Sequence, residues 1–263
     1  MATAEVARLT LRQNRRGAFG WIVGVAALTL LYSSSYKSIG GAKSAAISSY
    51  PASLKQALNL QDLTSPVGYL NATVFGIPLL LLTTIYVVSA ATRSVAGDEE
   101  SGALDLILAY PVSRSSLVLA RMLAMVAVLV GWGVVLFGVV LLLRAPTGLS
   151  IGVSALAAET FTWLLLGCSL AGISLLISAA IGHPSNSLGI AAGVMLLAYL
   201  ADSFIPLIDG LAWVRNLSPY YWFVGSDALS NGLSLWHCAL LAGTAVAATA
   251  LAAVALNRRD IGV

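Results

Sequence analysis

The stretch GDEESGALDLILAYPVSR, residues 97–114, decides how the rest of the chain is interpreted. It opens with three consecutive acids at positions 98–100, turns apolar, and reaches a proline at position 111. Charge is scarce elsewhere: of 263 residues only 10% are charged and 59% are hydrophobic. A soluble domain carries roughly 25% charged residues. Three carboxylates in a row are therefore unusual for this composition, and their location must be established first.

Long apolar runs flank this stretch on both sides. Six segments are apolar over about 20 residues or more, which is long enough for a helix to cross a bilayer. Their apolar residues are continuous rather than alternating, so we expect helices and not the strands of a barrel. The predicted fold class is an all-α integral membrane protein, a single transmembrane domain over 1–263. The six transmembrane helices are expected at 18–36, 69–91, 116–143, 155–181, 188–208 and 237–256.

The distribution of Lys and Arg predicts which side of the membrane each loop faces. With the N-terminus inside, nine basic residues fall on the inner side and five on the outer side. The inner ones crowd the helix ends, where they count most for orientation. Both termini and the stretch 97–114 are thus predicted to be cytoplasmic. Arg121, about one turn into the third span, is expected to snorkel its charge toward the cytoplasm.

The N-terminal residues 1–16 predict an amphipathic helix on the inner membrane surface. Glu5 and three arginines recur at spacings of three and four, so they share one helical face. We expect these arginines to face anionic headgroups. A simple positive-inside anchor is the alternative. The arginines of this interfacial helix are Arg8, Arg12, Arg15 and Arg16.

An aromatic-rich segment, 209–236, separates the fifth span from the sixth. It is too apolar for a free loop, and Pro219, Gly225 and Gly232 interrupt it too often for a span. We expect a short helix–turn–helix that re-enters the outer leaflet. An ordinary interfacial belt of aromatic side chains is the alternative.

Ionisable residues at membrane depth are candidates for a substrate path or outer gate. Asp202 lies near the outer end of the fifth span and Glu159 near the outer end of the fourth. For Asp202, a simple interfacial position is the alternative. Together with the aromatic segment, the gate candidates are Asp202, Glu159, Tyr220, Tyr221 and Trp222.

Small residues and cysteines in the spans predict packing rather than chemistry. Gly189 and Gly193 lie four apart in the fifth span, a spacing that allows close helix packing within or between subunits. Cys168 and Cys238 fall in apolar spans without the spacing of a metal site, so we expect free packing residues. No metal site and no nucleic-acid partner is expected.

Residues 97–110 themselves predict a short amphipathic helix in the cytoplasm. The three acids would begin it, where they suit the positive end of the helix dipole. Leu104, Ile107 and Leu108 repeat at three and four, giving an apolar side, and Pro111 ends the helix. Carboxylates of adjacent helical residues diverge, which argues against a metal or catalytic cluster. Such a helix is suited to docking on another protein, and a solvated first turn is the alternative.

The string DEESGALDLILAYPVSRSSLVLARML resembles the cytoplasmic loop of ABC-2-type permeases, the membrane subunits of ATP-binding-cassette exporters. That loop runs as an acidic pair, a glycine, a leucine-rich stretch, a proline, a small residue and an arginine. The wider layout is similar too, so the resemblance covers essentially the whole chain. The matching positions are Glu99, Glu100, Gly102, Leu104, Leu106, Leu108, Pro111, Ser113 and Arg114.

The resemblance implies an exporter subunit in the plasma membrane of a prokaryote. Two such subunits would pair, a homodimer being favoured, and each would dock on a separate cytosolic ABC ATPase that binds ATP and Mg²⁺. Residues 97–110 would be the coupling helix that passes ATPase closure to the spans, and 209–236 would resemble the family's outer gate helices. The residues expected to dock are Asp98, Glu99, Glu100, Ser101, Gly102, Leu104, Asp105, Leu108, Pro111 and Arg114.

The sequence contains no match to the phosphate-binding loop G-x-x-x-x-G-K-[ST]. In the nearest string, YKSIGGAKS, Lys37 and Ala42 replace the two glycines. We therefore expect no cofactor on this chain and no enzymatic activity of its own. The expected cargo is an amphipathic drug, antibiotic or lipid-like molecule moved outward.

Two other classes of function remain open from the sequence. A secondary transporter driven by an ion gradient would need paired charges inside the membrane. A non-transporting anchor would recruit a cytosolic partner through residues 97–110.

Overall fold

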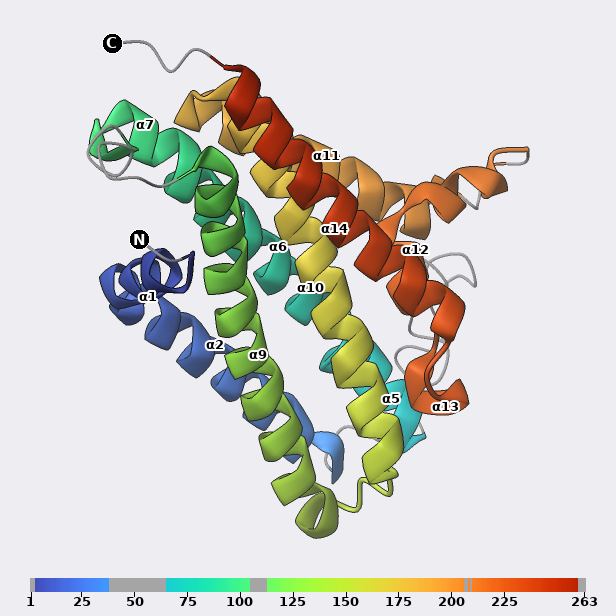
Figure 1. The fold of residues 1–263 in the computed structure, drawn as a ribbon. Helices are drawn as coiled ribbons and strands as arrows, with labels where there is room; N and C mark the ends of the chain where they lie inside the picture. The colour runs from blue at the N-terminus through green and yellow to red at the C-terminus, as the bar shows by residue number, and fades with distance from the viewer. Residues whose placement is uncertain (1–2, 38–64, 105–112, 206–207, 209, 260–263) are drawn as a thin grey trace.

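The computed structural model describes residues 3–37, 65–104, 113–205, 208 and 210–259. Within these ranges the regular structure is helical (Figure 1). Six helical runs are long and apolar enough to cross a membrane, which confirms the predicted fold class. They are Arg15–Ser34 (α2), Pro66–Glu100 (α5, α6, η1 and α7), Arg114–Thr147 (α9), Val153–Ile181 (α10), Pro184–Ser203 (α11) and Leu235–Arg258 (α14).

The N-terminal helix α1, Thr3–Gln13, is amphipathic as predicted. Its arginines are exposed, whereas Val6, Ala7 and Thr10 are buried. The buried side packs on α9, so part of the apolar face covers a neighbouring helix rather than lipid. Figure 1 looks almost along α1 while α2 runs across the view, so the chain turns sharply between them.

The second span is built from consecutive helical pieces. Ser65 caps α5, Pro66–Thr73, by accepting a hydrogen bond from the Gly68 N–H at 3.0 Å. A turn at Gly76 then leads into α6, Ile77–Thr92, and a Cβ at position 76 would collide with the carbonyl of Ala72. The run continues through a π-helical turn, η1 (Arg93–Gly97), into α7, Asp98–Glu100.

Helix α10 is central, with α6, α9, α11 and α14 packed around it (Figure 1). Its Trp163 is fully buried and stacks on Trp132 of α9 with ring centroids 6.4 Å apart. Trp21 of α2 and Tyr86 of α6 complete the aromatic cluster around Trp132. The Trp163 indole N–H donates to Thr83 Oγ1 at 3.1 Å, which satisfies a polar group in an apolar interior.

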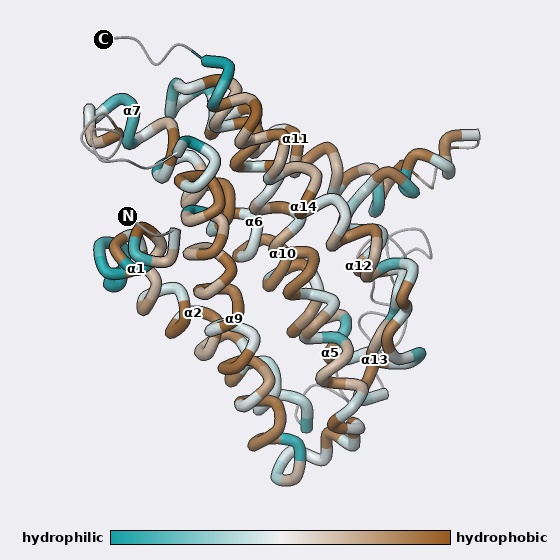
Figure 2. The backbone as a smooth tube through the Cα atoms, in the orientation of Figure 1, coloured by the Kyte–Doolittle hydropathy of each residue, from teal (hydrophilic) through white to brown (hydrophobic). Residues whose placement is uncertain are grey.

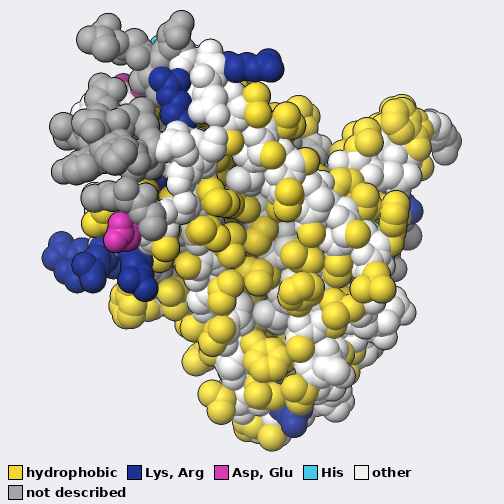
Figure 3. Space-filling model, viewed as in Figure 1, with side chains coloured by type: hydrophobic (Ala, Val, Ile, Leu, Met, Phe, Trp, Pro, Cys, Tyr) yellow, Lys and Arg dark blue, Asp and Glu magenta, His cyan; other side chains and the backbone are white. Residues whose placement is uncertain are grey.

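The outside of the bundle is largely apolar. Leu142, Leu197 and Val246, on three different spans, each expose two thirds or more of their surface. Figure 2 shows hydrophobic colour along the length of the spans, with hydrophilic residues gathered near α1, α7 and the C-terminus. In Figure 3 the visible face is mostly yellow, and basic side chains gather at the same end. Apolar surface on this scale requires lipid or protein to cover it.

Short helices between α11 and α14 pack against the spans. They are η3 (Ala212–Leu217), α12 (Pro219–Val224) and α13 (Ala228–Asn231). α12 packs on α10, α11 and α14, and α13 packs on α10 and α5. The segment therefore contains short helices joined by turns, and the re-entrant helix–turn–helix stays a prediction.

Candidate functional site

The three acids at positions 98–100 end a helix instead of beginning one. The helical run from Ile77 continues unbroken to Glu100, and Gly102, with φ of 72°, terminates it. Acids at this end face the negative pole of the helix dipole, so the explanation based on a favourable dipole is wrong. Residues 103 and 104 are helical again, and the rest of the predicted coupling helix, 105–110, lies outside the described residues.

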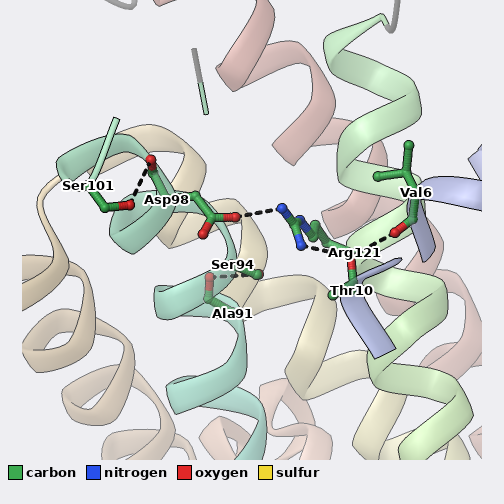
Figure 4. A network of polar contacts seen from close by, with 7 residues as sticks. All are labelled: Val6, Thr10, Ala91, Ser94, Asp98, Ser101 and Arg121. Atoms are coloured by element: carbon green, nitrogen blue, oxygen red, sulfur yellow. Dashed lines mark hydrogen bonds and ion pairs between the residues drawn. The ribbon is translucent and has the colours of Figure 1, made fainter. Parts of the chain in front are cut away.

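Arg121 compensates the first of these acids. Its Nη2 lies 2.5 Å from Asp98 Oδ2, and its Nη1 donates to Thr10 Oγ1 at 2.7 Å (Figure 4). Thr10 in turn donates to the carbonyl of Val6. Arg121 is only 4% exposed, so the expectation that it snorkels to water is wrong. One side chain of α9 thereby joins α7 to α1.

Arg259 compensates the second acid. Its Nη2 lies 2.7 Å from Glu99 Oε1, and its Nη1 donates to the carbonyl of Ala179, near the end of α10, at 3.1 Å. The guanidinium occupies the place where a Cβ on Gly182 would lie, and Gly182 has φ of 75°. The residue after α14 thus closes the end of α10 and holds α7. We call Asp98, Glu99, Arg121 and Arg259 the inner cluster.

Arg114 makes a further connection at the same end. Its Nη1 donates to the carbonyls of Leu256 and Arg259, at 3.0 and 2.6 Å. Ser113 caps the start of α9 by accepting from the Ser116 N–H at 3.1 Å. The beginning of α9 is therefore fastened to the end of α14, and the Arg114 side chain is engaged within the chain.

The other predicted docking residues divide into two groups. Glu100 and Ser101 are exposed and free to meet another protein, whereas Leu104, predicted to lie on the docking face, is fully buried within this chain. Three more, Asp105, Leu108 and Pro111, lie outside the described residues. Glu100 is thus the acid of the triplet best placed for an intermolecular contact.

Glu159 faces the protein interior from the second turn of α10. It is 3% exposed, and its Oε2 accepts a hydrogen bond from the Leu229 N–H at 3.1 Å. Beside it, Asn71 of α5 donates to Asp227 Oδ1 at 2.9 Å. Two polar contacts therefore attach α13, one to α10 and one to α5.

Of the three aromatic gate candidates, Tyr220 forms a side-chain hydrogen bond to a span. Its hydroxyl lies 2.6 Å from Thr84 Oγ1, and because Thr84 already donates to Leu80, the tyrosine is the donor. Tyr221 instead lies under the Arg215 guanidinium, 4.5 Å from its ring centroid. Trp222 donates to the carbonyl of Asn216 in its own segment.

Asp202 is half-buried near the end of α11. The cation acting on it is Arg215, and no ion pair joins it to another residue in the described part of the chain. The cysteines Cys168 and Cys238 are both free. Within the described residues no group of three His, Cys, Asp or Glu side chains is arranged to hold a metal.

A cavity of about 330 Å³ lies between α6 and α11. Its walls are mainly aliphatic, and Tyr220 closes it with the Thr84 hydroxyl beside it. Such a space accommodates an apolar or amphipathic molecule and provides few polar groups to orient it. The lining residues on the two helices include Leu81, Ile85, Val88, Ala192, Met195 and Leu196.

Comparison with known proteins agrees with this architecture. A family model described as ABC-2 family transporter protein matches residues 4–261. The chain belongs to the ABC-2 family. The probable ABC transporter permease protein NosY of Stutzerimonas stutzeri is 27% identical over 140 residues. That match covers 51% of this chain and 48% of NosY, so the chain spans about half the length of the curated relative it matches. Like its family, this ABC-2 chain is a multi-pass membrane protein.

The partners of the acids in this ABC-2 chain were not predicted from the sequence. For Arg121 the sequence did contain a signal. It lies inside an apolar span, where an ionisable side chain normally has a partner. No such signal predicts the pairing of Arg259 with Glu99, because the two residues lie 160 positions apart in the sequence.

Proposed function

We propose that this chain is the membrane subunit of an ABC exporter, moved by a separate cytosolic ATPase that binds ATP and Mg²⁺. The observation that carries the proposal is the inner cluster. Its two ion pairs fasten the end of the second span to α1, α9, α10 and α14. Charge-assisted hydrogen bonds are short and strong, so a displacement of α7 is passed to these helices together.

Residues 97–110 would then be the docking element, with its base at the inner cluster. Glu100 and Ser101 stay exposed beside this base. Two ATPase subunits, each bound to this element of one permease copy, would move the spans whenever the two ATPase subunits close on each other. The orientation that follows places both termini in the cytoplasm, in the plasma membrane of a prokaryote.

In this proposal the cavity between α6 and α11 is part of the substrate path. Thr84 lies close to the middle of the 35-residue run Pro66–Glu100, and Tyr220 reaches it from the outer segment. Contact at that depth supports a re-entrant outer segment acting as a gate. The aliphatic walls support an amphipathic drug, antibiotic or lipid-like cargo that is moved outward.

A second copy of the chain would complete the path. α11 exposes much of its apolar surface, including Ile190 and Leu197, and the space beside Gly189 and Gly193 is open. Small residues four apart allow another helix to approach closely. We therefore place a homodimer contact on this side of the molecule.

Co-purification with its cognate ABC ATPase tests the docking role. Glu100→Lys reverses an exposed charge that has no ion pair in the described part of the chain, so we expect ATPase recovery to fall about tenfold or more, as for a lost charge contact. Glu5→Lys reverses another exposed acid, on α1 and outside 97–110, and as the control it should leave recovery unchanged. Equal recovery in both variants would contradict docking at this element.

Transport by the reconstituted complex tests the energy source. Dye or antibiotic movement into proteoliposomes should require ATP and both proteins. Transport by this chain alone that collapses with the proton gradient would favour a secondary transporter. An intact complex without transport or stimulated ATP hydrolysis would point to a membrane anchor.

A further inference from the structure

A second cavity, of about 320 Å³, opens at the inner end of the bundle. Asn14 and Gly17 line it where α1 turns into α2, and Arg93 and Asp98 line it from the end of the second span. Arg121 reaches it from α9. In Figure 4 the Arg121 side chain lies between Asp98 and Thr10, from α7 and α1. Three separate parts of the chain therefore converge on this space.

The cavity is polar at one end and apolar at the other. Its basic residues, Arg93 and Arg121, lie toward the inner ends of the second and third spans. Tyr86 and Val128, which also line it, are each seven residues deeper, a distance of about two helical turns. Trp21 adds a further apolar surface. This polarity matches a molecule with an anionic head and an apolar body.

The polar end has unused donors for such a head. Arg121 is 4% exposed, and its Nε has no hydrogen-bond partner among the described residues. Within the same ranges the Arg93 guanidinium forms no ion pair. The lining holds two guanidiniums and one carboxylate, Asp98, so one positive charge is uncompensated. A buried donor without a partner destabilises the fold unless something else accepts from it.

We propose that this cavity binds the phosphate headgroup of an anionic phospholipid from the inner leaflet. Guanidinium groups form strong charge-assisted hydrogen bonds with phosphate, and basic pockets between spans on the cytoplasmic side suit acidic headgroups. Arg93 and the free Nε of Arg121 supply the donors. The acyl chains would begin along Trp21 and Val128 and continue into the bilayer.

This lipid site is separate from the proposed cargo path, which lies between α6 and α11. It touches Asp98 and Arg121, which join α7 to α1 and α9. A bound headgroup would therefore hold the base of the docking element in place. The lipid would act as a structural ligand rather than as cargo.

Native mass spectrometry of the purified full chain tests the site. Phosphatidylglycerol and phosphatidylcholine of equal chain length are titrated separately, and retained adducts are counted. We expect the wild-type chain to retain phosphatidylglycerol preferentially. Arg93→Gln should weaken that binding about tenfold, since a hydrogen bond to a charged group is lost. Arg16→Gln, which removes an exposed charge on α2 outside the cavity lining, should change it less than twofold.

A second variant separates the cavity from surface charge. Ala90→Phe fills the space while keeping every arginine, and it should reduce retention of phosphatidylglycerol as strongly as Arg93→Gln. Thermal unfolding in detergent verifies that each variant is folded. Equal losses in Arg93→Gln and Arg16→Gln, or full retention in Ala90→Phe, would overturn the site.

Inorganic phosphate distinguishes the two sources of the headgroup chemistry. If phosphate at millimolar concentration leaves the lipid adduct in place, the acyl chains contribute to binding and the lipid assignment stands. If phosphate replaces the lipid and itself stays on the chain in an Arg93-dependent manner, the ligand is a free anion and the lipid assignment fails. Equal retention of both phospholipids would also overturn it.

Discussion

At the end of the molecule where α7 lies, single arginine side chains determine which helices stay together. Arg121 and Arg259 each satisfy a carboxylate of α7 and a polar group of a second helix. Asp98 and Glu99 are one quarter exposed or less, so their charges need partners more than acids on an open surface do. Removing one partner leaves the other partly buried and unpaired.

Replacing Arg121 tests this dependence. Arg121→Gln leaves Asp98 without its partner, and we expect a loss of about 3 kcal/mol in the free energy of unfolding, measured as a lowered thermal midpoint in detergent. The double variant Asp98→Asn with Arg121→Gln removes both charges and should recover part of the loss. Equal stability of the single and double variants would show that the two side chains are not coupled.

Gly182 provides a second test at this scale. Gly182→Ala places a Cβ where the Arg259 guanidinium lies, on a residue with φ of 75°. We expect a loss of about 1–3 kcal/mol, the usual effect of such a backbone conformation, together with a weakened pair to Glu99. Gly20→Ala, in open space on α2, is the control and should not lower the thermal midpoint. A similar midpoint for both variants would argue against the close approach of Arg259.

At the scale of elements, the short outer helices depend on the spans for their position. α13 has only four residues, too few for a helix to be stable alone. The Glu159 carboxylate and the Asn71–Asp227 contact hold it against α10 and α5. α12 is held in the same way by the Tyr220–Thr84 bond and by Ser218, which donates to the carbonyl of Ala198 at 2.7 Å.

Glu159 is the residue through which this attachment can be measured. Glu159→Leu removes the acceptor for the Leu229 N–H, so we expect a loss of about 1–3 kcal/mol and faster proteolysis within 225–233. Glu159→Gln keeps an acceptor oxygen at the same place and should protect the segment nearly as well as the native residue. Matching digestion rates for the two variants would mean that the carboxylate does not hold α13.

At the scale of the whole molecule, the exposed face of α11 is where we propose that a second copy binds. Two spans are mostly uncovered: α11 has 22% of its most apolar window buried and α2 has 17%, whereas the central α10 has 56%. The cavity between α6 and α11 opens on the same side. A second copy placed there would cover apolar surface and enclose the cavity in one step.

Cysteine cross-linking tests this arrangement. In a chain with Cys168→Ala and Cys238→Ala, Ile190→Cys on exposed α11 should form a disulfide-linked dimer in membranes, because equivalent residues meet across a twofold axis. Val246→Cys on α14 is more exposed than position 190 and should nevertheless stay monomeric. Cross-linking through position 246 and not 190 would place the dimer contact on another face.

The sequence by itself determined the number of spans and the amphipathic face of α1. These features depend on local composition and on the need to satisfy backbone hydrogen bonds in lipid, which a single segment reveals. It also drew attention to the acids at 98–100. Their role in the helix was misjudged, because the π-helical turn at Arg93–Gly97 carries the second span further than its apolar run indicates.

Only the tertiary structure decided what those acids bind. Glu99 pairs with Arg259 and Asp98 with Arg121, partners that are 160 and 23 residues away in the sequence. The buried state of Leu104 and the cavity beside Arg93 likewise depend on helices that meet only after folding. Periodicity predicts which face of a helix is apolar, and it does not identify the neighbour that covers it. That neighbour is selected by the packing of the whole bundle.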